Sequence, residues 1–384
     1  MSGAHYSPRE MLDALVAMPT VSRDSNLDLI DFVCDYLGGH GVAARRVASD
    51  CGQKANLYAT IGPEAPGGVV LSGHTDVVPV DGQDWQSDPF RISERDGRLY
   101  GRGTCDMKSF LATALALVPE MNRLRRPIHL AFSYDEEVGC LGAPRLIEAL
   151  CAELPQPEAV IVGEPTEMRV VTAHKSMFIF ETEVRGFEAH SSKQNLGVPA
   201  VMVAGRLINW LAEQQDRNRE RADPDSPFEP GYSTLHCGVV HGGTAQNITA
   251  KQCRFVTDIR TLPDEAPEDF FRELERYARE VLEPEMRRVH PDTGIDFHIR
   301  SQVPGFAARE NEPAVALARQ LTGQNTSESV AYGAEAGQFQ EAGLSVAMCG
   351  PGSIDQAHQP NEFISLDQFE QGVVFMRRLI ERLS

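Results

Sequence analysis

The sequence predicts an α/β protein with a doubly wound, mostly parallel sheet and an inserted α+β domain. Short apolar runs alternate with amphipathic helical segments over the first 170 or so residues, a pattern typical of parallel strands with helices on both faces. The pattern changes near residue 174 and resumes after about residue 305. A chain of 384 residues also exceeds the usual size of one domain. We therefore expect one domain from residues 1–175 and 305–384, interrupted by a second from 176–304.

The first domain is predicted to open with two helices. Ser7, Pro8 and Glu10 form a helix-start signal, and apolar residues follow at helical spacing until Pro19. Residues 26–38 repeat the amphipathic pattern and stop at a glycine pair. Strands are then expected at 56–62, 67–74, 128–134 and 159–164, and helices after Met107 and at 142–152.

The inserted domain is predicted to mix amphipathic strands with long helices. Its segments are a strand at 177–186, a helix at 198–214, strands at 233–243 and 253–260, an acidic helix at 264–283 and a strand at 295–303. The doubly wound pattern then returns with a helix at 312–322, a strand at 344–352 and a final helix from about residue 366.

Composition excludes several classes of partner. A formal net charge of −19 disfavours binding to nucleic acid or to anionic lipid, because the electrostatic interaction would be repulsive. We see no signal-peptide pattern at the amino terminus and no apolar run of roughly 18 residues. A cytoplasmic protein without a membrane segment is therefore expected. Its eight dispersed cysteines are interpreted as reduced thiols.

Acidic and imidazole side chains follow the predicted strands, where open α/β sheets place their ligands. Each one alone could be a helix cap, a turn residue or a structural histidine. Together they offer five donors of the kind that zinc prefers, which suits two ions sharing a bridging carboxylate better than one tetrahedral ion. These candidate ligands are His74, Asp106, Glu137, Glu164 and His358.

Six motifs occur in a familiar order: SGHTDVVP, YGRGTCDMK, SYDEEVG, VGEPT, GGTAQNI and AHQPNEF. Over essentially its whole length the chain resembles the family of zinc hydrolases that contains acetylornithine deacetylase, succinyl-diaminopimelate desuccinylase, aminoacylase and carboxypeptidase G. The resemblance implies a zinc-peptidase-like catalytic domain and an inserted lid and dimerisation domain. It also implies a homodimer and two divalent ions per chain, zinc in the first place, with cobalt as a substitute.

The resemblance assigns the metal ligands to two sites. Asp106 would bridge the ions, His74 and Glu164 would complete one site, and Glu137 and His358 would complete the other.

Further roles carry over to residues beside the ligands and in the inserted domain. Asp76 matches the carboxylate that holds the other ring nitrogen of the histidine ligand, and Glu136 matches the general base. His190 matches the lid histidine that stabilises the oxyanion, often across a dimer interface. Asn247 and Arg260 match residues that hold the substrate carboxylate.

The segments YGAEAGQF and GPGSIDQAHQPNEF, with Cys105, are closest to the acetylornithine-deacetylating branch. The expected reaction is hydrolysis of N2-acetyl-L-ornithine to L-ornithine and acetate, in arginine biosynthesis. Glu335 is the candidate for recognising the cationic side chain of this substrate by charge complementarity, although it could instead be a helix N-cap.

The sequence is also compatible with other functions. Ser109, Ser176 and Ala334 depart from the expected pattern, which leaves room for a succinyl-diaminopimelate desuccinylase, or for a broader N-acyl amino acid hydrolase or metallodipeptidase. The alternative outside enzymes is a catalytically dead scaffold of the same fold, against which the complete ligand set argues.

Overall fold

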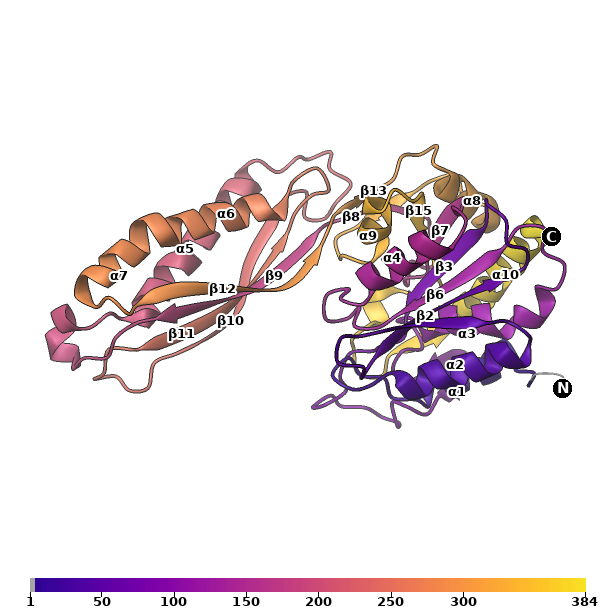
Figure 1. Cartoon of the computed structure of the whole chain (residues 1–384), viewed down its shortest axis with the longest axis horizontal. Helices are drawn as coiled ribbons and strands as arrows, with labels where there is room; N and C mark the ends of the chain where they lie inside the picture. The colour runs from indigo at the N-terminus through magenta and orange to yellow at the C-terminus, as the bar shows by residue number, and fades with distance from the viewer. Residues whose placement is uncertain (1–3) are drawn as a thin grey trace. The chain divides into compact units, whose positions relative to one another are not determined.

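The computed structural model describes residues 4–384, which form two compact units (Figure 1). The first unit contains the chain up to Ala173 together with residues 306–329 and 334–384. The second contains residues 174–305 and 330–333, so a short segment that we expected in the first domain groups with the inserted unit. An α/β fold with a mostly parallel sheet and a separate antiparallel unit is confirmed.

A nine-stranded sheet forms the centre of the first unit, in the order β1-β2-β6-β3-β7-β15-β8-β13, with β14 paired to β8. Neighbouring strands from β6 to β15 run parallel, whereas β1 pairs antiparallel to β2, β2 to β6, and β8 to β15. The strands are β1 (Ala44–Ala48), β2 (Ala55–Ile61), β3 (Val69–His74), β6 (Ile128–Ser133), β7 (Ala159–Val162), β8 (Val171–His174), β13 (Phe306–Ala307), β14 (Glu328–Val330) and β15 (Val346–Met348). A small antiparallel sheet contains β4 (Ser93–Arg95), β5 (Arg98–Tyr100) and β16 (Phe363–Ser365).

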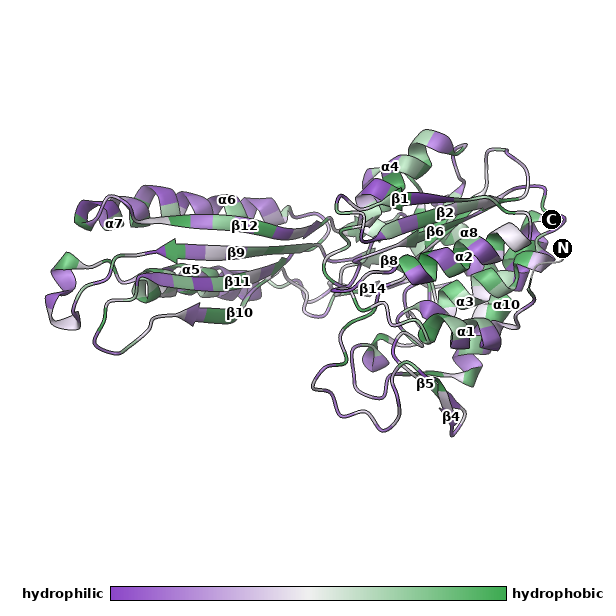
Figure 2. Cartoon of the chain, turned by 60° about the horizontal axis from the view of Figure 1, so that its bottom comes forward, coloured by the Kyte–Doolittle hydropathy of each residue, from purple (hydrophilic) through white to green (hydrophobic). Residues whose placement is uncertain are grey.

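Helices cover both faces of the large sheet (Figure 2). Every residue of β3, β6 and β7 is buried, as expected for parallel strands between two helical layers. On one face α4 contacts β1 and β2, and α9 packs against α4. The other layer consists of α1, α2, α3, α8 and α10, whose apolar residues form one core with the sheet. The helices are α1 (Pro8–Val16), α2 (Leu27–Gly39), α3 (Lys108–Ala116), α4 (Ala143–Glu153), α8 (Pro313–Thr322), α9 (Ala336–Glu341) and α10 (Leu366–Leu383).

The amino-terminal helix begins as its sequence predicts. The Ser7 hydroxyl accepts a hydrogen bond from the Glu10 amide, and the Glu10 carboxylate accepts one from the Ser7 amide, which completes a capping box. At the other end, the buried Lys108 ammonium donates to the carbonyls of Leu15 and Met18. The side chain of Lys108, the first residue of α3, thus caps the carboxyl-terminal end of α1.

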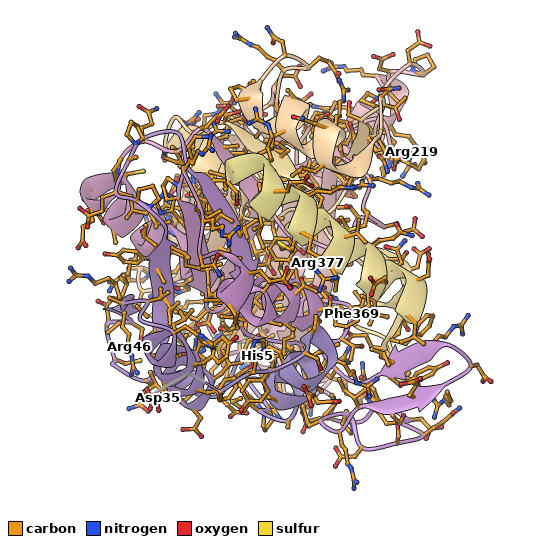
Figure 3. All side chains as sticks on the ribbon, turned by 90° about the vertical axis from the view of Figure 1, so that its right-hand side faces the viewer. His5, Asp35, Arg46, Arg219, Phe369 and Arg377 are labelled. Atoms are coloured by element: carbon orange, nitrogen blue, oxygen red, sulfur yellow. The ribbon has the colours of Figure 1, made fainter. Side chains whose placement is uncertain are left out.

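The carboxyl-terminal helix α10 is amphipathic. Phe369 is buried in the core of the first unit, while Arg377, on the same helix (Figure 3), pairs with Glu120 at 3.3 Å. The helix therefore seals one side of the core and presents its charged side to solvent.

The second unit is an antiparallel sheet in the order β10-β11-β9-β12. Buried residues alternate with partly or fully exposed ones along β9 and β11, because helices cover only one face of this sheet. Helix α5 contacts β9, β10 and β11, α6 contacts β9, and α7 contacts β12. The elements are β9 (Met177–Arg185), α5 (Ala200–Glu220), β10 (Thr234–Gly242), β11 (Gln252–Arg260), α6 (Pro267–Tyr277), α7 (Glu283–Val289) and β12 (Gly294–Val303).

The acidic helix of this unit is longer than predicted and is interrupted. A π-helical turn at Ala278–Leu282 joins α6 to α7, which continues to Val289 instead of ending at residue 283. Pro284 lies in the first turn of α7 and has no amide hydrogen to donate, which favours an irregular turn before it.

All eight cysteines are free, as expected for reduced thiols. Among the helices of residues 4–384, none is long and apolar enough to cross a membrane.

His129 makes the stability of the first unit sensitive to acid. Its ring is completely buried in β6, and burial lowers its pKa to about 4. Because an unfolded histidine titrates near 6.5, this contribution is fully present above about pH 6.5 and is lost as the pH falls through about 4. The free energy of unfolding should drop by about 3 kcal/mol over that range. We expect His129→Gln to flatten this dependence in urea melts at several pH values.

His298→Gln, a change of an exposed histidine in β12, provides the matched control and should keep the wild-type pH dependence. An equal slope for the wild type and His129→Gln would contradict the assignment.

Candidate metal centre

The predicted ligands lie at one edge of the large sheet. The register places His74, at the end of β3, opposite Ser133 at the end of β6. Val162, which ends β7, pairs with Met348 at the end of β15. Because these strands are parallel, the loops that follow them emerge on the same side. Residues far apart in the sequence therefore meet there.

Two groups of possible ligands form at this edge. The first consists of His74, Asp106 and Glu164, and the second of Asp106, Glu137 and His358. Within each group the candidate ligand atoms lie within 4.8 Å of one another. The groups share Asp106 and together contain all five side chains predicted as ligands.

Asp106 faces both groups with different oxygen atoms. His74 Nε2 lies 3.0 Å from Oδ1, and His358 Nε2 lies 3.4 Å from Oδ2. His358 Nε2 is also 2.8 Å from Oε2 of Glu137. The His358 side chain is 52% exposed, whereas those of Asp106 and Glu137 are nearly buried. The arrangement suits a bridging carboxylate.

The charges of this cluster fit a pair of divalent cations. Burial, followed by repulsion from Asp106, raises the pKa of Glu164 to about 8. The same two causes raise the pKa of Glu137 to about 7, although the hydrogen bond with His358 opposes them. Nearby protein cations therefore do not balance these carboxylates. Bound divalent ions would do so, and their binding would displace protons from the ligands.

Glu136 is adjacent to the ligand Glu137 but belongs to neither ligand group. Burial, and then repulsion from Glu164, raises the pKa of Glu136 well above its usual value. A carboxylate beside the ligands, and free of them, has the properties needed to accept and return a proton.

Asp76 contacts His74 most closely through its backbone. The atom that lies 2.8 Å from His74 Nδ1 is the backbone carbonyl oxygen of Asp76, while the nearest carboxylate oxygen is 3.7 Å away. The carboxylate instead accepts hydrogen bonds from the amides of Glu136 and Glu137 and from the hydroxyl of Ser22. The carboxylate of Asp76 therefore positions the loop after β6, and its predicted role toward the imidazole ring stays a prediction.

Glu362 is a supporting residue that the sequence reasoning missed. Its side chain is 1% exposed and accepts hydrogen bonds from the amides of Gly103, Cys105 and Asp106. It also pairs with Arg102 at 2.7 Å. Glu362 therefore holds the backbone that carries the bridging carboxylate. The signal available was its place in the AHQPNEF motif, but nothing in that motif reveals its partner 260 positions away.

Two predicted lid residues lie side by side in the second unit. An isolated β-bridge joins His190 to Ile248, and the Asn247 carbonyl accepts a hydrogen bond from the amide of Ser191. Both His190 and Asn247 are exposed. The His190 ring is oriented by Ser192, whose hydroxyl lies 2.8 Å from Nδ1.

Arg260 lies at the other end of the same sheet. It ends β11, where Ile259 pairs with Phe178 near the start of β9, whereas His190 follows the end of β9. The nine residues of β9 span roughly 26 Å at the usual rise of a strand. The structure thus separates Arg260 from the other two lid residues, and its guanidinium is paired with Asp258 at 3.1 Å.

Glu335 lies close to the ligand cluster, where its charge acts on Glu164. It occupies the N-cap position of α9 without a capping hydrogen bond from its side chain. The residue is 1% exposed, and its carboxylate accepts a hydrogen bond from the Ser72 hydroxyl at 3.3 Å. Burial raises its pKa. The predicted role of Glu335 in recognising the cationic side chain of the substrate stays a prediction.

Comparison with known proteins agrees with this geometry. The model of the peptidase family M20/M25/M40 matches residues 70–382. Acetylornithine deacetylase of Myxococcus xanthus is 35% identical and is matched over 99% of this chain and 98% of the relative. Those of Pasteurella multocida and Shigella sonnei are 32% and 34% identical, with 97% and 92% of this chain covered and 96% and 92% of the relatives.

Solved structures share the fold at low sequence identity. An M20 family metallo-carboxypeptidase from Sulfolobus solfataricus has a TM-score of 0.76 at 18% identity, covering 98% of this chain and 99% of that one. A dinuclear metal binding peptidase of the M20 family from Bacillus subtilis has a TM-score of 0.65 at 16% identity, with 98% and 97% covered. These similarities establish the architecture.

Metal content should depend on which group a substitution removes. We expect about two ions per chain in the wild type, about one in His74→Ala and in His358→Ala, and almost none in Asp106→Ala. The reason is that only Asp106 belongs to both groups. Elemental analysis of purified protein by mass spectrometry measures this directly.

Asp96→Asn, an exposed aspartate in the β4–β5 turn, should keep the wild-type metal content. Full occupancy of both sites in Asp106→Ala would rule out a shared carboxylate.

Proposed function

The chain belongs to the M20/M25/M40 peptidase family, and we propose that it hydrolyses N2-acetyl-L-ornithine to L-ornithine and acetate. It is a metal-dependent hydrolase by family and by its deacetylase relatives. The observation that carries the proposal is the pair of ligand groups sharing Asp106. The relatives at 32–35% identity are named for this substrate, and we therefore place the reaction in arginine biosynthesis.

Five side chains would hold the ions, for which we propose zinc, with cobalt as a substitute. The mixed imidazole and carboxylate donors suit zinc. When bound, the two ions polarise the scissile carbonyl and make the attacking water more acidic. One site would use His74 and Glu164, the other Glu137 and His358, and Asp106 would serve both.

Glu136 would move the proton in this reaction. Its carboxylate takes a proton from the attacking water and returns it to the departing amine of ornithine, so the carboxylate is regenerated in each turnover. The hydrogen bonds from the amides of Glu136 and Glu137 to Asp76 hold the loop that carries the base. The base and its neighbouring ligand are thereby fixed together.

The lid residues would bind the substrate and the developing charge. His190 would stabilise the oxyanion, and Asn247 and Arg260 would hold the substrate carboxylate. Because Arg260 lies at the opposite end of the sheet from His190 and Asn247, one small substrate cannot contact all three within one chain. We therefore propose that His190 and Asn247 serve the active site of a second copy.

A dimer through the second unit has a suitable surface. Strand β10 is the edge of its sheet and has an unpaired side. Exposed apolar residues gather on β10, on the neighbouring α5 and beside His190, and Val201, Met202 and Ile248 line one hollow of about 330 Å³. The exposed residues are Leu196, Val201, Met202, Val239, Val240 and Ile248. Such a patch is typical of a surface that another protein covers.

The first test is a substrate panel. Wild-type protein loaded with zinc or cobalt should hydrolyse acetylornithine faster than succinyl-diaminopimelate, acetylmethionine or dipeptides. Glu136→Gln should keep its metal but lose roughly two to four orders of magnitude in kcat, because the amide cannot accept the proton from water. Ornithine release and metal content measure the two effects.

Other results of the substrate panel would each support one of the alternative functions. A preference for succinyl-diaminopimelate, or for acetylmethionine and dipeptides, would replace the proposed substrate with that class. Absence of hydrolysis in metal-loaded protein would indicate a scaffold. High turnover by Glu136→Gln would remove Glu136 as the base.

The shared active site is tested by mixing two inactive variants. In a heterodimer of His190→Ala and Glu136→Gln, one site combines an intact Glu136 with an intact His190 from the other subunit. If His190 acts across the interface, random reassociation at equal amounts should restore about a quarter of the wild-type specific activity. Activity is measured on the whole mixed population, without separating heterodimers from homodimers.

Purified homodimers of each variant provide the baseline. A mixture no more active than the homodimers would show that His190 acts within its own chain, whereas monomers in sedimentation would exclude the dimer.

A further inference from the structure

Cys140 lies in a tight turn that folds back on the proposed base. The amides of Gly139 and Cys140 both donate to the Glu136 carbonyl at 2.8 Å, and the amide of Leu141 donates to the Asp135 carbonyl at 3.0 Å. This turn brings the side chain of residue 140 back toward that of Glu136.

The thiol of Cys140 contacts the Glu136 carboxylate directly. Its Sγ is 3.3 Å from Oε1 of Glu136, with the S–H group donating. Cys140 is completely buried, and burial raises the pKa of its thiol well above the usual value. The side chain thus stays a protonated donor, of the weak kind that thiols provide.

The backbone at this position does not favour a cysteine. Cys140 has a φ of 54°, in the left-handed region where glycine is unstrained and a side chain costs energy. Glycine would adopt this backbone conformation at a lower energetic cost than cysteine. What a cysteine adds here is the hydrogen bond to Glu136.

The turn is also held from the opposite side. Gln338, in α9, donates a hydrogen bond from Nε2 to the Cys140 carbonyl at 3.2 Å. Residue 140 is therefore fixed through its backbone, and its thiol has a defined direction. A fixed donor can restrict the rotation of the carboxylate that accepts from it.

We propose that Cys140 is a positioning residue for the general base. Its S–H bond to Oε1 fixes the rotation of the Glu136 carboxylate and leaves Oε2 as the oxygen that takes the proton from water and returns it to the amine. The thiol keeps its own proton throughout. This inference rests on the proposed function of Glu136 and goes beyond it by naming what orients the base.

Cys140→Ala and Cys140→Ser separate this role from packing. Both keep a Cβ atom at the same backbone position, but only serine can donate to Glu136. With the N-acyl amino acid that the wild type hydrolyses fastest, we expect kcat of Cys140→Ala to fall about tenfold, with KM within about twofold and metal content unchanged. Cys140→Ser should recover kcat to within about threefold of the wild type.

Cys349→Ala is the matched control. Cys349 is another completely buried cysteine, and its thiol donates to the Met168 carbonyl instead. We expect this variant to lower the melting temperature without changing kcat.

The outcomes distinguish the two proposals. Wild-type kcat in Cys140→Ala, an equal loss in Cys140→Ala and Cys140→Ser, or a loss expressed in KM would overturn the role of Cys140 while leaving the function intact. Turnover by Glu136→Gln in the same series would remove the base and the Cys140 proposal together. A wild type that hydrolyses no N-acyl amino acid would sink the proposed function itself.

Discussion

Mutual repulsion among buried carboxylates is the constraint on which the architecture of the first unit depends. Asp106, Glu136, Glu137 and Glu164 interact with one another in surroundings that solvate charge poorly. Such a cluster is costly in a folded protein unless cations compensate it. Parallel strands supply rigidity to hold it, since His74 ends β3, and Glu137 and Glu164 follow β6 and β7, three strands that are completely buried.

A second group of carboxylates supports the first without facing the ligand groups. Glu362 accepts three backbone amides around Asp106, and Asp76 accepts two around Glu136 and Glu137. These hydrogen bonds stabilise negative charge locally. They also determine where the two ligand loops lie, so the geometry of the centre depends on residues that belong to neither ligand group. In the role that we propose for it, the Cys140 thiol likewise orients one carboxylate, that of Glu136, by donating a hydrogen bond to it.

The length of the inserted sheet imposes a different constraint. Its register places Arg260 at one end, and His190 and Asn247 at the other, farther apart than a small molecule can reach. An unpaired edge strand and an apolar surface accompany this separation. Both features are explained together if two copies share their active sites, because the symmetry of a dimer can bring one end of each lid to the other copy.

The sequence by itself determined the fold class, the order of the main elements and the five candidate ligands. These features depend on local patterns: the periodicity of apolar residues, helix caps such as Ser7, and motifs that directly follow strands. Such patterns can be read from the sequence because each depends only on residues that are close together in the chain.

Only the tertiary structure decided which atoms meet. The carbonyl rather than the carboxylate of Asp76 contacts His74, Glu335 is buried against β3, and Glu362 reaches the Asp106 loop from more than 250 positions away. The separation of Arg260 from His190 likewise follows from strand register. Such pairings depend on how distant segments pack, and competition among several donors for one carboxylate has no signature in the order of residues.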